Sequence, residues 1–334
     1  MKGSAAANAP PKAGAGASLS DADTLFDDAF LKRLEYLDLV AKKVQASHER
    51  GERRSKKLGA GLEFADHRRY TPGDDFKHVD WNVYARLGKL LLRQYEEEED
   101  LFVYLLVDAS ASMAVGRDAP LAPRVSSVRT AGKAITPAWT KLDQARRLAA
   151  ALAYIALASL DRASLVTFSE KLGQRLLPAR GKAQIHRIFQ FLKQTQPGGR
   201  TSFHDAMRGF VHETRRRGLV VLLSDFYAQD GWKDGLDYLS YNRFETVVVQ
   251  LVDERELHPN LRGDILLVDV ETQAEKEITL TPRLLDKYRA AHAAFSHELE
   301  AYAKAHQIPY FKASVQTPFD DVVVSMLRTG GFLK

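Results

Sequence analysis

Three oxygen-bearing side chains follow a strongly apolar segment at alternate positions of the chain. Residues 101–107 read LFVYLLV and are followed by Asp108, Ser110 and Ser112 in a D-x-S-x-S pattern. A carboxylate and two hydroxyls are hard oxygen ligands of the kind that Mg²⁺ or Mn²⁺ prefers. The same residues could instead cap a helix that follows the strand, so the choice depends on which other groups lie nearby.

Two other segments place oxygen side chains where they could join the first three. Ser224 and Asp225 follow the apolar run 219–223, and Thr201 lies in a glycine-containing loop just before a helical pattern. Ligands of an open parallel sheet bind at the carboxyl ends of its strands, so these residues are expected to converge on one edge. Ser202 offers a neighbouring hydroxyl that could serve in place of Thr201.

A site of this composition favours adhesion over bond breaking. Hydroxyl ligands are neutral, so they leave the charge of a divalent cation partly uncompensated. An open coordination position would then attract a carboxylate from a partner protein. This interpretation requires no catalytic group, and we expect the chain not to be an enzyme.

The elements that must position these residues alternate along the C-terminal part of the chain. Apolar runs rich in Val and Leu predict buried strands at 101–107, 163–168, 219–223, 246–251, 265–270 and 308–312. Helical spacing of apolar residues predicts helices at 142–160, 183–195, 203–217, 232–241 and 282–306. This alternation predicts the α/β class, with a mostly parallel sheet covered by helices on both faces.

Composition divides the chain into further segments. Residues 1–20, rich in Ala, Gly, Pro and Ser, are predicted to form a disordered tail without the apolar core of a secretory signal. Residues 21–57 are expected to form an amphipathic helix and a basic loop, and residues 58–98 a small β-rich subdomain with many turn formers. The α/β domain would then occupy residues 99–330, interrupted by a polar insertion at residues 117–141.

The overall composition excludes several classes of protein. The 334 residues contain no cysteine, which rules out disulfides, thiolate zinc sites, iron–sulfur clusters and a cysteine nucleophile. The longest uncharged apolar run, residues 148–160, is shorter than the ~20 residues of a membrane-spanning helix, and we expect a buried helix there. The net charge of +5 is small for this length, so a nucleic-acid-binding module is a less favoured interpretation.

The D-x-S-x-S pattern, with Thr201 and Asp225 following in order, resembles the metal-ion-dependent adhesion site of von Willebrand factor A domains. That resemblance implies that Asp108, Ser110, Ser112 and Thr201 coordinate Mg²⁺ or Mn²⁺. Asp225 would act directly or through a water molecule. The resemblance also implies that the α/β domain is a Rossmann-like von Willebrand factor A domain.

A longer block, residues 58–113, resembles the signature of the bacterial domain-of-unknown-function family 58. The residues that carry this likeness are Gly61, Glu63, Phe64, Arg69, Tyr70, Gly73, Asp74, Asp75, Asp80, Trp81, Ala85, Arg86, Glu97 and Asp108. The likeness covers roughly residues 47–330. It implies chaperone-like assembly of an unidentified protein client together with a MoxR-type AAA+ ATPase. Many members carry two N-terminal membrane helices, which this sequence lacks, so a cytoplasmic location is expected.

The same block contains charges of alternating sign and one tryptophan, namely Arg69, Asp74, Asp75, Asp80, Trp81 and Arg86. The charges could pair with one another and hold the small subdomain together. Alternatively, these residues form a surface on which a partner protein docks. We expect Trp81 to be a buried anchor and not a base-stacking residue.

Two other function classes are less favoured. A metal-dependent phosphoester hydrolase of the haloacid-dehalogenase type needs a second acid two residues after the first, where this chain has Ser110. The pattern G-x-x-x-x-G-K-[ST] is absent, so the chain is not expected to bind ATP through a P-loop. A nucleic-acid-binding module would depend on the basic residues 48–57 and on residues 215–217, three arginines that could simply complement the C-terminal end of a helix.

Overall fold

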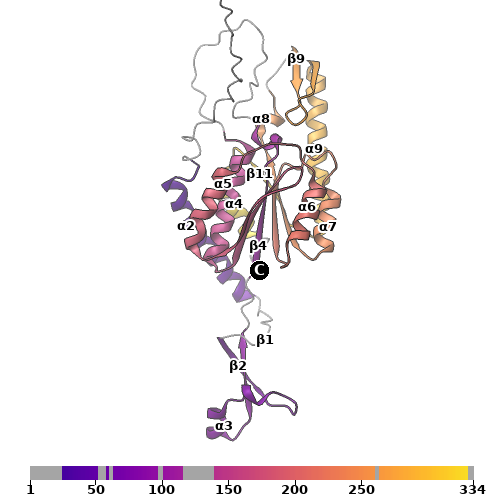
Figure 1. Ribbon diagram of the computed structural model, residues 1–334. Coiled ribbons are helices and arrows are strands. Elements are labelled where there is room, and N and C mark those ends of the chain that lie inside the picture. The colour runs from indigo at the N-terminus through magenta and orange to yellow at the C-terminus, as the bar shows by residue number, and fades with distance from the viewer. Residues whose placement is uncertain are drawn as a thin grey trace, which may run out of the picture.

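The structure, a computed structural model, describes residues 25–51, 58–59, 63–96, 101–115, 139–259 and 263–329. Its centre is a six-stranded sheet with the strand order β11-β8-β7-β4-β5-β6 (Figure 1). The strands are β4 (Phe102–Asp108), β5 (Arg162–Phe168), β6 (Leu172–Arg180), β7 (Leu219–Ser224), β8 (Glu245–Val252) and β11 (Tyr310–Ser314). All neighbours are parallel except β6, which pairs antiparallel with β5. The expected α/β class with a mostly parallel sheet is confirmed.

Helices cover both faces of this sheet, as Figure 1 shows. One face packs against α2 (Asp28–Gly51), α4 (Lys141–Ala158), α5 (Ile185–Gln194) and α10 (Phe319–Arg328). The other face packs against α6 (Phe203–Glu213), α7 (Lys233–Tyr241) and α9 (Pro282–Ala305). Because both faces are covered, the central strands are apolar throughout their length.

Helix α4 lies between the sheet and a further layer of helices. It packs against α2, α5 and α10 as well as β4 and β5. A helix with apolar residues on all of its faces is typically buried in this way. The expected buried helix at 148–160 is confirmed, and it forms the C-terminal part of α4. Aromatic contacts hold the outer helix α2 and the residues just before it, with Phe26 stacked on Phe189 at 4.6 Å and Phe30 of α2 against Phe319 at 4.7 Å.

A separate three-stranded antiparallel sheet has the order β1-β3-β2. Its elements are β1 (Leu58–Gly59), β2 (Glu63–Arg69), the 3₁₀ turn η1 (Phe76–His78), helix α3 (Trp81–Leu87) and β3 (Leu91–Glu96). Asp80 caps α3 by accepting bonds from the Asn82 and Val83 amides. Its other oxygen lies 2.9 Å from Arg93 Nε, and this bond to Arg93 lowers the pKa of Asp80 below its usual range.

Two sequence predictions within the α/β domain are wrong. The run at 265–270 is not a strand of the central sheet, since β9 (Gly263–Val268) pairs only with β10 (Glu275–Leu280) in an exposed hairpin. A short apolar run does not distinguish a strand buried in the main sheet from an exposed strand outside it. Helix α6 ends at Glu213, so residues 215–217 lie beyond it and do not complement its last turn. Strands β6 and β10 and helix α10 were not predicted.

Several predicted segments lie outside the described residues, namely the tail at 1–20, part of the basic loop at 48–57 and most of the insertion at 117–141. Within the described ranges, no helix is both long and apolar enough to cross a bilayer. The chain is described again from residue 139, and Lys141 is the first residue of α4. Lys141 therefore belongs to a helix of the domain.

The start of α4 is held by a reciprocal capping box, and this local structure positions Lys141. Thr140 Oγ1 accepts a bond from the Asp143 amide, and the Asp143 carboxylate accepts bonds from the Thr140 amide and hydroxyl. Thr140→Ala should lower the free energy of unfolding by about 1–2 kcal/mol, because the cap is buried. Urea denaturation checks this value. Thr140→Ser keeps the hydroxyl and should unfold close to wild type, and equal losses in both variants would contradict the capping explanation.

Candidate functional site at the carboxyl end of the sheet

The chain reverses its direction of travel across the sheet between β4 and β7. From β4 it proceeds to β5 and β6 on one side, whereas β7, β8 and β11 follow on the other. Such a switch point at the carboxyl ends of the strands is where open α/β sheets bind ligands. Asp108 ends β4 and Ser224 ends β7, so the structure brings these two predicted strand ends together.

Asp108 is fully buried, and both of its oxygens are held in place. Oδ1 accepts the Ser110 amide at 2.9 Å, and Oδ2 accepts the Ser224 hydroxyl at 2.6 Å. The Ser110 and Ser112 hydroxyls lie 3.0 Å apart. The D-x-S-x-S segment thus turns back on itself and gathers a carboxylate and two hydroxyls, and its first serine caps no helix through its side chain.

The loop that carries Thr201 lies directly against this segment. The Gly198 amide donates to the Ala109 carbonyl at 2.8 Å, and the Ala111 amide donates to the Gly199 carbonyl at 3.1 Å. Gly199 has a φ of +78°, a left-handed conformation that favours glycine. These backbone bonds bring two segments about 90 residues apart in sequence to one edge, as the sequence predicted.

Thr201 differs from its neighbour Ser202 in what its hydroxyl contacts. Thr201 is 4% exposed, and its Oγ1 is buried with no hydrogen-bond partner among the described residues. Ser202 Oγ instead bonds Asp230 at 2.9 Å and Asp205 at 3.4 Å. A buried hydroxyl without a partner costs stability unless something else binds it. Of the two hydroxyls, that of Thr201 is therefore the better candidate ligand.

Asp225 is fully buried and makes a contact that the sequence analysis missed. Its Oδ2 lies 2.8 Å from Lys141 Nζ, and the same ammonium lies 2.8 Å from Glu256 Oε2. The backbone after Asp225 is held in a left-handed conformation, with a φ of +63° at Phe226. Strain of this kind in a non-glycine residue is often found at functional sites.

A signal for these missed residues was present in the sequence. Lys141 stands in the first turn of an apolar helix, where the macrodipole disfavours a cation. Glu256 belongs to a short helix, α8 (Glu254–Leu257), that directly follows the third parallel strand end. Polar residues at that end could have been added to the predicted site by the same rule that selected Asp108 and Asp225.

Among the described residues, the carboxylates of this site outnumber the ammonium that pairs with them. The buried carboxylates of Asp108 and Asp225 repel each other, and Asp225 shares the Lys141 ammonium with the half-buried Glu256. Burial and the nearby charge of Asp225 raise the pKa of Asp108 to about 7. Burial alone would lower the pKa of Lys141, but the charges of Asp225 and Glu256 hold it above its usual value. A proton or a cation would relieve the remaining repulsion.

Glu271 brings a fourth carboxylate to this edge from the turn of the β9–β10 hairpin. Its Oε1 is buried without a hydrogen-bond partner in the described part of the chain. Burial and the charges of Asp225 and Asp269 raise its pKa, whereas the Thr201 amide lowers it. Glu271 and Thr201, each with an unpartnered buried oxygen, therefore lie near each other.

The donor set decides which cation the site could hold. Across the described ranges, no three His, Cys, Asp or Glu side chains are grouped as ligands of a metal ion. The Ser110 and Ser112 hydroxyls lie beside the carboxylate of Asp108, and Thr201 closely follows the loop whose backbone bonds this segment. This all-oxygen set, with one hydroxyl left unpartnered, fits a hard divalent cation such as Mg²⁺ or Mn²⁺.

The charged block of the small subdomain lies apart from these residues in the sheet topology. Arg68 forms a bidentate pair with Asp74, both bonds being 2.9 Å long, and Asp75 caps η1. Internal pairing is thus part of the role of this block. Arg69 and Arg86 are exposed and form no ion pair with another described residue.

Trp81 is not the buried anchor that the sequence analysis expected. Its side chain is 57% exposed and meets Tyr84 edge to face, with ring centroids 6.1 Å apart. The reason is local, because Trp81 is the first residue of the short helix α3, which contains no buried residue. Trp81 and Arg86 therefore remain candidates for contact with a partner.

The chain is similar to several uncharacterized mycobacterial proteins. It is 28% identical over 239 residues to an uncharacterized protein of Mycobacterium bovis, covering 71% of this chain and 69% of the relative. An uncharacterized protein of Mycobacterium tuberculosis matches to the same extent. A protein of Mycobacterium avium, also uncharacterized, is 33% identical over 90 residues, covering 27% of this chain and 51% of the relative.

Among solved structures, the conserved hypothetical protein BatB of Bacteroides thetaiotaomicron is similar with a TM-score of 0.41 and 12% identity. That similarity covers 69% of this chain and 98% of BatB. An aerotolerance-related membrane protein of Bacteroides fragilis has a TM-score of 0.37 and 13% identity over 70% of this chain and 98% of its own. The family described as protein of unknown function DUF58 matches residues 66–298, well over half of the chain, and the chain therefore belongs to that family.

Proposed function

We propose that the chain is a non-enzymatic adhesion protein whose α/β domain is of the von Willebrand factor A type. It binds Mg²⁺ or Mn²⁺ through Asp108, Ser110, Ser112 and Thr201, with Asp225 directly or through water. The cation in turn binds an acidic group of a partner protein. The unpartnered hydroxyl of Thr201 carries this proposal, because it is buried beside the segment that gathers the other donors.

Electrostatics supports the same proposal. The switch point holds an excess of buried carboxylates, and Asp108 has a raised pKa because of burial and Asp225. A divalent cation would offset this repulsion and supply a positively charged coordination position. The chain's own residues hold the donors rigidly, since both Asp108 oxygens accept hydrogen bonds from neighbouring elements.

Family membership supports the choice of partner. The resemblance described above associates such proteins with MoxR-type AAA+ ATPases. We therefore propose a MoxR-type ATPase as the partner, with which the chain acts in the cytoplasm on an unidentified protein client. Trp81 and Arg86, exposed on the small subdomain, offer one surface for that contact. A pull-down from the native cell with and without chelator tests the partner, and recovery of no ATPase in either condition would contradict it.

The sharpest test of the cation site is Thr201→Val, which removes one oxygen and keeps the shape of the side chain. Without a divalent cation, this variant should be as stable as wild type or more stable by about 1 kcal/mol, because an unpartnered hydroxyl is removed. With Mg²⁺, it should bind at least about tenfold more weakly, because a ligand is lost. Isothermal titration calorimetry and urea denaturation with and without Mg²⁺ measure the two effects.

Ser202→Ala is the matched control, since its hydroxyl is bonded to Asp230 and Asp205. It should leave Mg²⁺ affinity close to that of wild type. If wild type itself shows no heat with Mg²⁺ or Mn²⁺, the proposed cation site is wrong. If Ser202→Ala loses affinity and Thr201→Val does not, the hydroxyl ligand is Ser202.

A further inference from the structure

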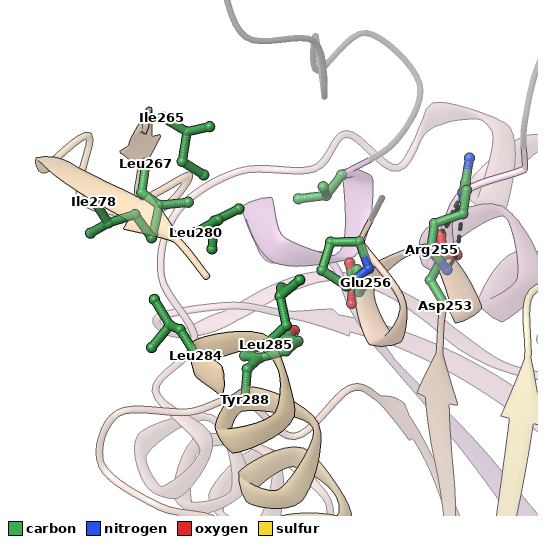
Figure 2. Close-up of a pocket in the computed structure, with 12 residues that line it drawn as sticks. Asp253, Arg255, Glu256, Ile265, Leu267, Ile278, Leu280, Leu284, Leu285 and Tyr288 are labelled. Carbon is green, nitrogen blue, oxygen red and sulfur yellow. Dashed lines mark hydrogen bonds and ion pairs between the residues drawn. The ribbon is translucent and has the colours of Figure 1, made fainter. Parts of the chain in front are cut away.

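An apolar cavity of about 400 Å³ opens beside the candidate cation site. Figure 2 shows the side chains that line it, which come from the β9–β10 hairpin, from the start of α9 and from the segment around Glu256. Pockets of about 300–1,000 Å³ with mainly apolar walls are typical of ligand-binding sites. The cavity is large enough to hold a bulky side chain.

The hairpin turns one apolar face toward the cavity. Ile265 lies opposite Ile278 in the register of β9 and β10, and Leu267 and Leu280 are on the same face of the hairpin. Tyr288 of α9 forms part of the opposite wall. The hairpin is not a strand pair of the central sheet, so its apolar side chains are not explained by the core. Exposed apolar surface of this kind marks sites of interaction.

The charged groups at the edge of the cavity form ion pairs within the chain. The Arg255 guanidinium bonds both oxygens of Asp253, with Nε at 2.9 and 3.0 Å. The Glu256 carboxylate lies 2.8 Å from Lys141 Nζ. The cavity thus presents no unpaired charge from these residues, and its charge complementarity favours an uncharged occupant.

Two residues of the cavity wall lie close to residues of the cation site. Glu256 lines the cavity and shares Lys141 with Asp225, each over a distance of 2.8 Å. Val115 also lines the cavity and directly follows η2 (Ala111–Ala114), the turn that contains Ser112. A group bound at the cation site and a neighbouring group in the cavity could therefore belong to one short segment.

We propose that the cavity receives a bulky aliphatic or aromatic side chain that adjoins, in a partner peptide, the acidic residue bound by the cation. The partner motif is then an Asp or Glu next to a Leu, Ile or Phe. This inference rests on the proposed function. It adds selectivity to the site, because a cation alone accepts any accessible carboxylate, whereas the cavity discriminates between the residues beside it.

The test uses the full chain and an array of heptapeptides centred on Asp, in which each flanking position is varied through all residues. In Mg²⁺, wild type should prefer peptides with Leu, Ile or Phe beside the Asp by about tenfold over those with Ala or Gly. Chelator should remove this binding. Replacing the central Asp with Asn should also remove it, because a neutral amide binds the cation poorly.

Two adjacent residues of the hairpin provide a matched pair of variants. Leu267 is 46% exposed and faces the cavity, whereas Leu266 is 51% exposed and points to the opposite face. Leu267→Ser should abolish the preference for aliphatic and aromatic neighbours, and Leu266→Ser should retain it. Tyr288→Ala, from the other wall of the cavity, should weaken the same preference without depending on the folding of the hairpin.

The outcomes separate this inference from the proposed function. If acidic peptides bind in a Mg²⁺-dependent way without any preference for their neighbours, the cavity proposal is overturned and the cation site stands. If no peptide binds, either with Mg²⁺ or with chelator, although calorimetry shows Mg²⁺ binding, the cavity proposal is likewise overturned. If Leu267→Ser instead abolishes self-association in sedimentation experiments, the occupant is a second copy of this chain, which also overturns the peptide proposal.

Discussion

Replacing Lys141 with methionine is expected to lower the free energy of unfolding by about 3–5 kcal/mol in Mg²⁺-free buffer. The Lys141 ammonium is buried and is shared by Asp225 and Glu256. Methionine fills a similar volume but leaves these two carboxylates, and the nearby Asp108, without a cation. Breaking a buried ion pair from one side is costly because the remaining charge stays desolvated. Urea denaturation in the presence of a chelator measures the loss.

The same variant should respond more strongly to Mg²⁺ than wild type does. With the ammonium gone, a divalent cation would supply positive charge next to Asp225, so saturating Mg²⁺ should recover part of the lost stability. Lys233→Met is the matched control, because the Lys233–Glu298 pair is exposed, and it should cost about 0–1 kcal/mol. Equal losses in the two variants would show that Lys141 is not the balancing charge of the site.

Asp108→Asn is expected to abolish cation binding and, without Mg²⁺, to raise the stability of the fold above neutral pH. The carboxylate is the charged donor of the proposed site, and an amide is a far poorer ligand. Burial and the charge of Asp225 raise the pKa of Asp108 to about 7. An ionised Asp108 is therefore unfavourable in the folded chain, and a neutral amide of the same shape removes that cost.

The direction of the pH dependence follows from linkage. The ordinary pKa of an aspartate is 3.8, so between about pH 4 and 7 the folded chain holds a proton on Asp108 that the unfolded chain has released. The free energy of unfolding of wild type should then fall as pH rises through this window and level off above it. The advantage of Asp108→Asn should grow over the same range and reach about 1 kcal/mol or more at pH 8.

Calorimetry with Mg²⁺ and denaturation from pH 4 to 8 in chelator test both parts of this prediction. Asp205→Asn serves as the control, because Asp205 contacts Ser202 and not Asp108. It should change neither the Mg²⁺ affinity nor the pH dependence of stability. Retention of wild-type Mg²⁺ affinity by Asp108→Asn would contradict the proposed ligand set. A variant that is less stable than wild type at pH 8 would show that Asp108 is a structural carboxylate.

Much of the architecture could be predicted because burial leaves a periodic trace. Strands β4, β7 and β8 are mainly apolar runs, and residues 148–158 of α4 are apolar on all sides of the helix, as in elements covered on both sides. The prediction of an element is wrong where an apolar run arises for a reason other than burial in the main core. In the run at β9, Ile265 and Leu267 face a cavity at the hairpin, and nothing within four or five residues reveals that the run lacks a place in the main sheet.

Surface and helix-end predictions fail for a related reason. Trp81 was expected to be buried because large aromatic side chains usually are, but the short helix α3 has no buried face. The arginines at 215–217 follow a helix that ends two residues earlier, and Arg217 instead lies over the Phe244 ring at 4.7 Å. The residue types alone did not show that α3 has no buried face or where α6 ends.

The sequence alone determined the chemistry available at the carboxyl ends of the strands. Asp108, Ser110, Ser112 and Asp225 follow apolar runs, and the parallel pairing of those runs brings them to one edge. Only the tertiary structure decided what surrounds them. Lys141 meets partners 84 and 115 residues away, the Thr201 hydroxyl has no partner among the described residues, and the hairpin lines a cavity near them. The physical reason is that burial sets the pattern of apolar residues within a short segment of the sequence. Ion pairs and cavities depend instead on which distant segments meet in the folded chain.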